Sequence, residues 1–96
     1  MLDKLTLEAF QPIAGSVFDV SLGGGSVIPL QLTEVLGNGL HGKTREQFSL
    51  RFRGPASPAL VQHIYHLEHP SLGALEIFLV PIGKDAGGMI YEAVFT

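Results

Sequence analysis

The amino-acid sequence predicts a mainly β protein, namely a small six-stranded antiparallel barrel or rolled sheet with one short N-terminal helix. Two observations support this fold class. Apolar and polar residues alternate in several stretches, most clearly over Phe48–Arg53, where every even-numbered residue is large and apolar. A period of two places alternate side chains on opposite faces of a strand. Clusters of Gly and Pro separate these stretches and are typical of turns.

The composition limits the class of protein. The 96 residues are enough for a single domain over residues 1–96, and the 46% hydrophobic content is enough for a core. The chain has no Cys, which excludes disulfides and thiolate metal sites. Its net charge of −3 argues against a nucleic-acid binder, since binding to phosphates needs a surplus of Lys and Arg. Without a secretory signal or a membrane-spanning stretch, we expect a cytoplasmic protein with no membrane contact.

One short helix is expected near the N-terminus. Thr6 is a good N-cap residue, and Glu8 in the first turn favours the helix dipole. Pro12 and Gly15 limit this helix to about two turns. Since such a short helix is not stable alone, its apolar side chains must dock on the sheet. These side chains are Leu7, Phe10 and Ile13.

Six segments have the alternation and length of strands: residues 17–22, 28–33, 48–53, 61–69, 74–82 and 89–95. Turns are predicted at Gly23–Gly25 and Pro70–Gly73, and a loop at Gly83–Gly88. A long, polar, Gly-rich loop is expected at residues 37–46, and the two interpretations of it are a functional binding element and a disordered segment. Because both faces of residues 77–82 are apolar, this strand should be central or covered by the helix.

Four motifs, Phe48–Pro55, Leu67–Gly73, Phe78–Gly83 and Tyr91–Phe95, carry a resemblance when they are taken together in this order. They resemble an uncharacterised family of short bacterial proteins that is known only as a domain of unknown function. The resemblance covers about residues 5–95. It implies an association with phage-tail-collar-like proteins and therefore a structural or assembly role, and it supplies no catalytic residues.

His63, His66 and His69 form a cluster with a spacing of three. On a strand, His63 and His69 point one way and His66 the other, so three metal ligands do not converge. A two-His metal site completed by Glu68 or Glu76 is one hypothesis. The alternative, which we favour, is that His66 faces outward and His69 caps the turn that follows it.

Four of the six basic residues, Lys43, Arg45, Arg51 and Arg53, lie close together in the sequence. They could form a patch that binds an anion or an acidic partner. The alternative, which we favour, is a solvated strand face in which outward Glu residues pair with the arginines across the sheet.

The sequence contains no assembled catalytic or cofactor site, so the leading hypothesis is a non-enzymatic protein-interaction or assembly module, accessory to a phage-tail-like structure. Its partner would be another protein or a second copy of the chain, the latter through an edge strand. The second hypothesis is a small-molecule-binding barrel whose mouth lies near Tyr65, Tyr91 and the loop at 37–46, which requires an apolar pocket. The third is a small metal-dependent enzyme that uses the histidine cluster.

Overall fold

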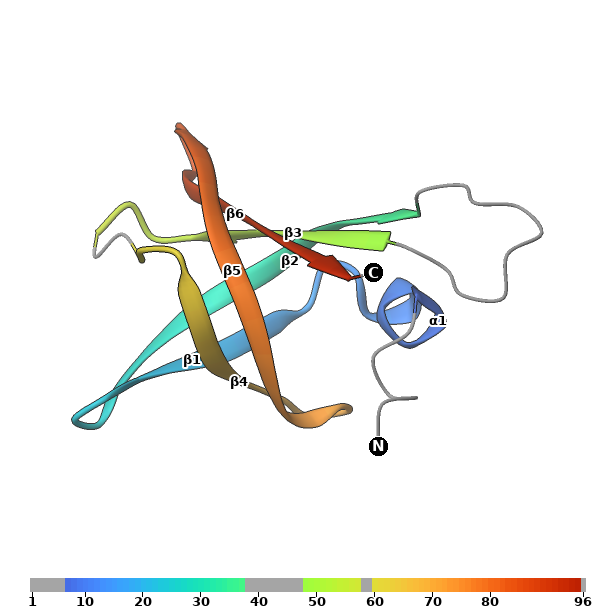
Figure 1. Ribbon diagram of the computed structural model, residues 1–96, viewed down its shortest axis with the longest axis horizontal. Coiled ribbons are helices and arrows are strands. Elements are labelled where there is room, and N and C mark those ends of the chain that lie inside the picture. Colours follow the sequence, from blue (N-terminus) through green and yellow to red (C-terminus); the bar gives the residue numbers. More distant parts are fainter. Residues whose placement is uncertain (1–6, 38–47, 58–59, 96) are drawn as a thin grey trace.

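The computed structural model describes residues 7–37, 48–57 and 60–95. Its elements in chain order are α1 (Leu7–Phe10), the 3-10 turn η2 (Gln11–Ile13), β1 (Val17–Gly23), β2 (Ser26–Gly37), β3 (Phe48–Gly54), β4 (His63–His69), β5 (Gly73–Asp85) and β6 (Gly88–Phe95). The strands form a closed antiparallel barrel in the order β1-β2-β3-β6-β5-β4 (Figure 1). The predicted six-stranded antiparallel architecture is confirmed. Of the two alternatives, a barrel and a rolled sheet, the structure shows the closed barrel.

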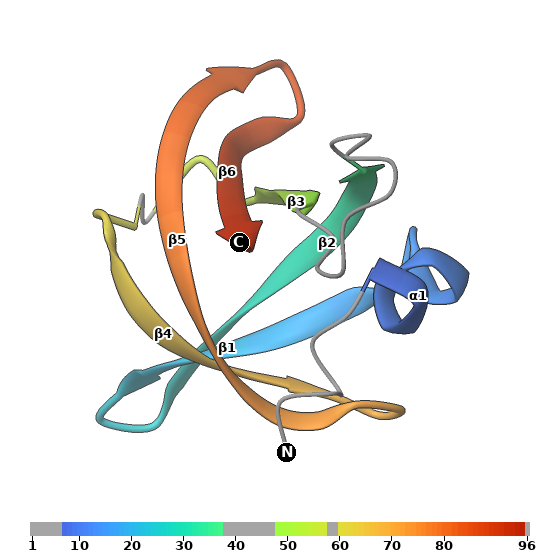
Figure 2. The same ribbon diagram turned by 45° about the vertical axis from the view of Figure 1, so that its right-hand side comes forward.

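Two long, bent strands make closure possible. The first half of β5 pairs with β4 and its second half pairs with β6, so that β5 curves around the barrel (Figure 2). In the same way β2 pairs first with β1 and then with β3. Bulges between Leu32 and Glu34 and between Pro81 and Gly83 accompany these changes of partner, because a bulge bends a strand and increases its twist. Pro29 lies in the half of β2 that has no ladder with β3, which fits its missing N–H.

The strands are longer than the sequence pattern predicts at several ends. β2 continues to Gly37, and β5 continues through Gly83 to Asp85, where we expected loops. The fourth strand begins at His63 and not at residue 61. The physical reason for the longer strands is that a backbone ladder needs no apolar side chain, so pairing with the neighbouring strand extends past the alternating residues.

The short helix closes one end of the barrel. α1 is a single turn that continues into η2, where Pro12 stands at the start. Phe10 is fully buried, and its ring lies 5.8–6.5 Å from the rings of Phe18, Phe48 and Phe95. The expected docking is therefore confirmed for Phe10 and for Ile13, which packs against the core. The cap residue Thr6 and the side chain of Leu7 lie outside the described part of the chain.

Side chains from all six strands fill the interior. The buried hydrophobic residues are Phe10, Phe18, Val20, Ile28, Leu30, Leu32, Phe48, Leu50, Phe52, Leu60, Leu67, Leu75, Ile77, Leu79, Tyr91 and Ala93. Tyr65, Met89 and Phe95 are partly buried against this core. The expected cover for the outer face of β5 is wrong, because the helix packs at the barrel end and Phe78 stays 47% exposed. β5 is central only in the sense that it pairs with β4 and β6.

The close approach of Gly88 to Gly54 gives a test of this packing. Gly88 has a φ of 131°, and a Cβ atom there would collide with the carbonyl oxygen of Gly54. Gly88→Ala should therefore lower the free energy of unfolding by about 2 kcal/mol or more, measured by urea denaturation. Gly83→Ala is the matched control, since a Cβ atom at Gly83 meets nothing within 4 Å, and its effect should stay within about 0.5 kcal/mol. Equal effects of the two substitutions would contradict this account of the packing between Gly88 of β6 and Gly54 of β3.

Candidate functional site

The barrel closes through a short junction between β1 and β4. This ladder has only three residue pairs, Asp19 with Glu68, Val20 with Leu67 and Ser21 with His66. We call it the β1–β4 seam. A surface hollow lies at each end of it, one bordered by Asp19, Glu68 and His69 and the other by Ser21, His63 and His66. The polar and titratable side chains that the sequence singles out on β4 therefore lie along the seam.

His69 holds one end of the seam. Its side chain is almost fully buried, with 7% of the residue exposed. The backbone N–H of Ser71 donates to Nδ1 over 3.0 Å, so Nδ1 carries no proton and the neutral ring has its proton on Nε2. Nε2 lies 2.9 Å from the Ser16 hydroxyl, which itself donates to the carbonyl oxygen of Ile13 over 2.5 Å. The Ser16 oxygen therefore accepts from Nε2–H, and every polar atom in this chain of bonds has a partner.

The histidine ring also packs against the core. Its centroid lies 4.5 Å from the ring centroid of Phe18, beyond the point where the β1–β4 ladder ends. His69 thus ties the turn after β4 to the segment that precedes β1. The predicted capping of this turn by His69 is confirmed. The bond to Ser16 was not predicted, because the two residues lie 53 positions apart in the sequence.

The direction of these hydrogen bonds bears on chemistry. In a Ser–His nucleophilic pair, the imidazole nitrogen accepts the serine proton and so activates the hydroxyl oxygen. Here the serine hydroxyl accepts from Nε2–H and donates to a backbone carbonyl. The pair is arranged to hold the two segments together, and not to activate Ser16 as a nucleophile.

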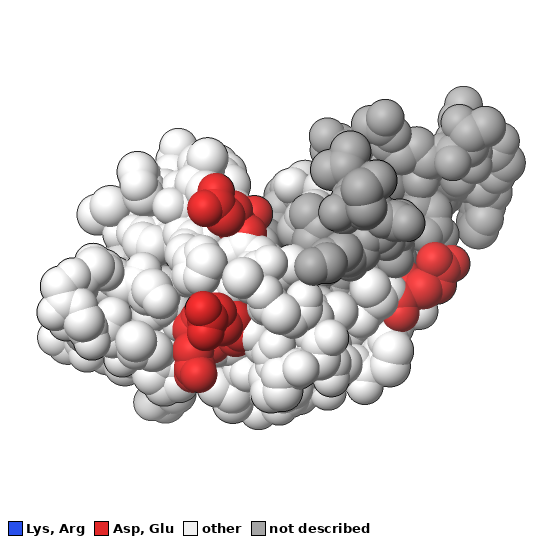
Figure 3. Space-filling view, turned by 90° about the horizontal axis from the view of Figure 1, so that it is seen from below, with Lys and Arg blue, Asp and Glu red and all other residues white. Residues whose placement is uncertain are grey.

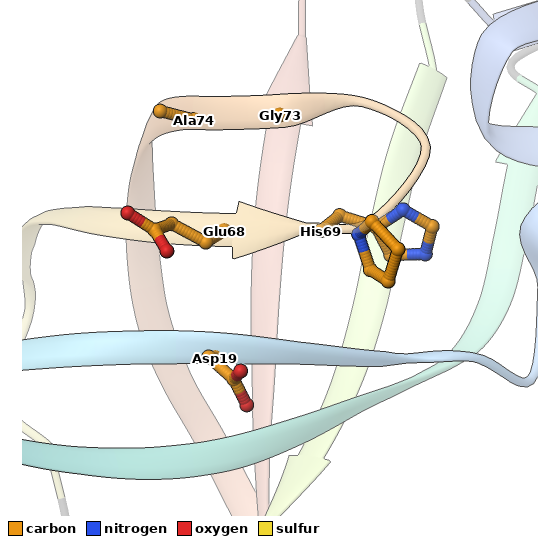
Figure 4. A pocket seen from close by; sticks show the side chains of 6 residues that line it. Asp19, Glu68, His69, Gly73 and Ala74 are labelled. Atoms are coloured by element: carbon orange, nitrogen blue, oxygen red, sulfur yellow. The ribbon is translucent and has the colours of Figure 1, made fainter.

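Two acidic residues lie at directly opposite positions in the seam. Asp19 on β1 is directly paired with Glu68 on β4, and both are exposed. Figure 4 shows their carboxylates turned away from one another beside the turn that carries His69. Like charges directly opposite in a ladder are unfavourable. The sequence pattern did not reveal this pair, because Asp19 and Glu68 lie 49 positions apart in the sequence.

His66 and His63 lie at the other hollow. His66 faces outward, as predicted, and its Nε2 is 3.2 Å from the Glu68 carboxylate. Across the ladders it is paired with Ser21 on one side and Glu76 on the other. His69 points into the barrel instead, so the three histidines do not converge. Within residues 7–37, 48–57 and 60–95, no group of three or more His, Asp or Glu side chains could hold a metal ion.

Arg51 and Arg53 are occupied by carboxylates of the same chain. Arg51 lies 3.6 Å from Glu34 and 3.9 Å from Glu92, and Arg53 forms an ion pair with Asp85. This agrees with the interpretation of a solvated strand face with outward acidic partners. The backbone N–H of Gly87, followed by the Arg53 side chain, holds the pKa of the Asp85 carboxyl below its usual value. Lys43 and Arg45, and most of the loop at 37–46, lie outside the described residues.

The two tyrosines expected at a ligand pocket have structural partners. Tyr91 is fully buried in the core, and its hydroxyl accepts from the backbone N–H of Leu60 over 2.8 Å. The expectation that Tyr91 lines an open barrel mouth is therefore wrong. The Tyr65 hydroxyl donates to the carbonyl of Val61 over 2.7 Å. Partial burial, and secondarily the proximity of Tyr91, raises the pKa of Tyr65.

An exposed apolar pair on the outer face was missed by the sequence reasoning. Ile64 on β4 and Phe78 on β5 are directly paired, and they are 56% and 47% exposed. Val94, 58% exposed, lies on the outer face of β6 beyond the last β5–β6 pair. The signal was present as the two apolar faces of residues 77–82, but we interpreted it as evidence of a strand that is central or covered by the helix.

Comparison with known proteins places the chain in a family. A domain of unknown function, DUF6916, matches residues 5–95, so the chain belongs to this family. No curated protein and no solved structure matches the chain. None of the described helices has the length and apolar character needed to cross a membrane. The function must therefore be argued from the side chains described above.

The role of the His69 bonds can be tested by substitution. Ser16→Ala leaves the buried Nε2–H of His69 without an acceptor, so the free energy of unfolding should fall by about 1–3 kcal/mol. His69→Ala should cost at least as much, because packing against Phe18 is lost as well. Ser21→Ala, an exposed substitution on the same seam, is the control and should change stability by less than about 0.5 kcal/mol. If Ser16→Ala were as mild as Ser21→Ala in urea denaturation, the bridge would have no energetic role.

Proposed function

We propose that this protein is a non-enzymatic protein-interaction or assembly module that docks through the outer face of β4, β5 and β6. The observation that carries the proposal is the directly paired Ile64 and Phe78, which stay about half exposed. The barrel interior is already filled by other side chains. Ile64 and Phe78 are therefore not needed to complete the core. An exposed apolar patch on a small protein commonly marks a contact surface.

The energetics of this pair suit a docking anchor. Covering Ile64 and Phe78, each about half exposed, would contribute about 1 kcal/mol or more apiece. Phe78 is moreover an aromatic residue in the half of β5 that pairs with β4, where the ladder holds it directly opposite Ile64. Rigid aromatic side chains lose little conformational entropy on binding and are frequent anchors of interfaces.

The hydrogen-bond geometry of Ser16 and His69 supports a non-enzymatic role, because the serine hydroxyl accepts from the imidazole. The filled interior around Tyr91 gives no support to a small-molecule-binding barrel. The setting beside phage-tail-collar-like proteins that the sequence resemblance implies remains part of the proposal. A bacterial origin and a cytoplasmic location are also part of the proposal. The partner is proposed to be another protein or a second copy of the chain, and not a nucleic acid or a membrane.

Site-specific photo-crosslinking tests this function. A benzoylphenylalanine residue replaces Ile64 or Phe78, and in the control it replaces Val27, which is 55% exposed on β2. In cells that naturally contain the protein, positions 64 and 78 should yield the same crosslinked protein, whether another protein or a second copy, and position 27 should not. Absence of a crosslink at 64 and 78, or an equal crosslink at 27, would contradict the proposed docking face.

A further inference from the structure

We infer that the docking face takes a cationic partner, a protein segment in which Lys or Arg residues flank apolar side chains. This inference rests on the proposed function and specifies the chemistry of the partner. It is carried by the order of side chains on the outer face, where an apolar row lies next to acidic rows that contain no Lys or Arg.

The outer face can be followed row by row across the ladders. The first row holds Ala74, Glu68 and Asp19, and the next holds Glu76, His66 and Ser21. The third row is the apolar pair Phe78 and Ile64. Successive outward residues on one strand are about 7 Å apart. A partner segment whose apolar side chain covers Phe78 therefore brings a residue about 7 Å away over Glu76.

No Lys or Arg occurs in β1, in β4 or in residues 73–79 of β5. The strands β1 and β4 run along the lower side of the barrel in Figure 1, and the view from below in Figure 3 shows Asp and Glu side chains without Lys or Arg among the described residues. The described arginines, Arg51 and Arg53, lie on β3 and are paired with other carboxylates. Within the described part of the chain, the acidic rows therefore have no Lys or Arg partner, and His66 contacts only the Glu68 carboxylate.

The negative charge of the docking face determines which class of partner can bind there. A second copy would bring a second set of the acidic residues Glu68 and Glu76 to the same interface, in a chain whose net charge is already −3. Nucleic acids and anionic lipid surfaces would meet the same repulsion. A cationic protein segment gains from both parts of the face, because its apolar side chains cover Ile64 and Phe78 and its cations relieve the repulsion between Asp19 and Glu68.

Peptide binding followed by nuclear magnetic resonance tests this inference. The probe is a synthetic peptide in which Lys and an apolar residue, Val or Leu, alternate at every second position with Ser between them, so that cationic and apolar side chains share one face of the extended peptide. Its counterpart carries Glu in place of Lys. The Lys peptide should shift the backbone amide signals of β4 and β5, and the Glu peptide should bind at least tenfold more weakly. The double variant Glu68→Gln with Glu76→Gln should weaken binding of the Lys peptide about tenfold, and Phe78→Ser should weaken it as well.

Glu8→Gln with Glu34→Gln is the matched control, because it removes the same charge elsewhere on the surface. This control should leave the affinity within about twofold, with folding of every variant verified from its amide spectrum.

Equal affinity for both peptides, equal loss in the control, or shifts centred on β3 would overturn the inference. A crosslink from position 78 to a second copy, or to another protein without binding of the Lys peptide, overturns it while leaving the proposed function intact. Absence of any crosslink from the docking face overturns the proposed function itself.

Discussion

Closure of the barrel depends on the β1–β4 seam, where three residue pairs join the first strand to the fourth. The ladders of β3 with β6 and of β4 with β5 are much longer and continuous. Where the seam ends, His69 is oriented by the Ser71 amide and continues the connection to the β1 side by its hydrogen bond to Ser16 and its contact with the ring of Phe18. Since Ser16 in turn binds the carbonyl of Ile13, the same bonds anchor the N-terminal segment that carries Phe10 into the end of the barrel.

This arrangement separates the protein into a filled interior and an outer face with two kinds of surface. On β3, Arg51 and Arg53 are paired with carboxylates on β2, β5 and β6, so the arginine charges are neutralised within the chain. On β1, β4 and the first half of β5, acidic side chains lie beside Ile64 and Phe78. Apolar exposure and uncompensated charge thus lie next to each other, and both favour contact with a partner of complementary chemistry.

Local regularities could be predicted from the sequence. The alternation at Phe48–Arg53 indicates a strand whose even positions are buried, and the structure places them there. The turn after His69 is equally local, and its cap could be predicted from the residues alone. The opposition of Asp19 and Glu68 and the bond from His69 to Ser16 could not, because both depend on the register of a long-range ladder. A pattern of period two fixes which face a side chain takes and says nothing about which strand lies beside it.

The outer face of β5 shows a different limit. Apolar residues on both sides of a strand are typical of a buried strand, and Phe78 is nevertheless half exposed because the helix packs at the barrel end. Sequence periodicity does not distinguish a face covered by the same chain from a face left for another molecule.

The tautomer of His69 is the most direct test of how the barrel is closed. Nitrogen-15 spectra of the imidazole rings at about pH 8, where an ordinary histidine is neutral, report which ring nitrogen carries the proton. The account predicts that His69 has its proton on Nε2 alone, with Nδ1 accepting from the Ser71 amide, and that exposed His63 shows a solvent-averaged mixture. A proton on Nδ1 of His69, or the same averaged mixture as at His63, would contradict the proposed closure of the seam.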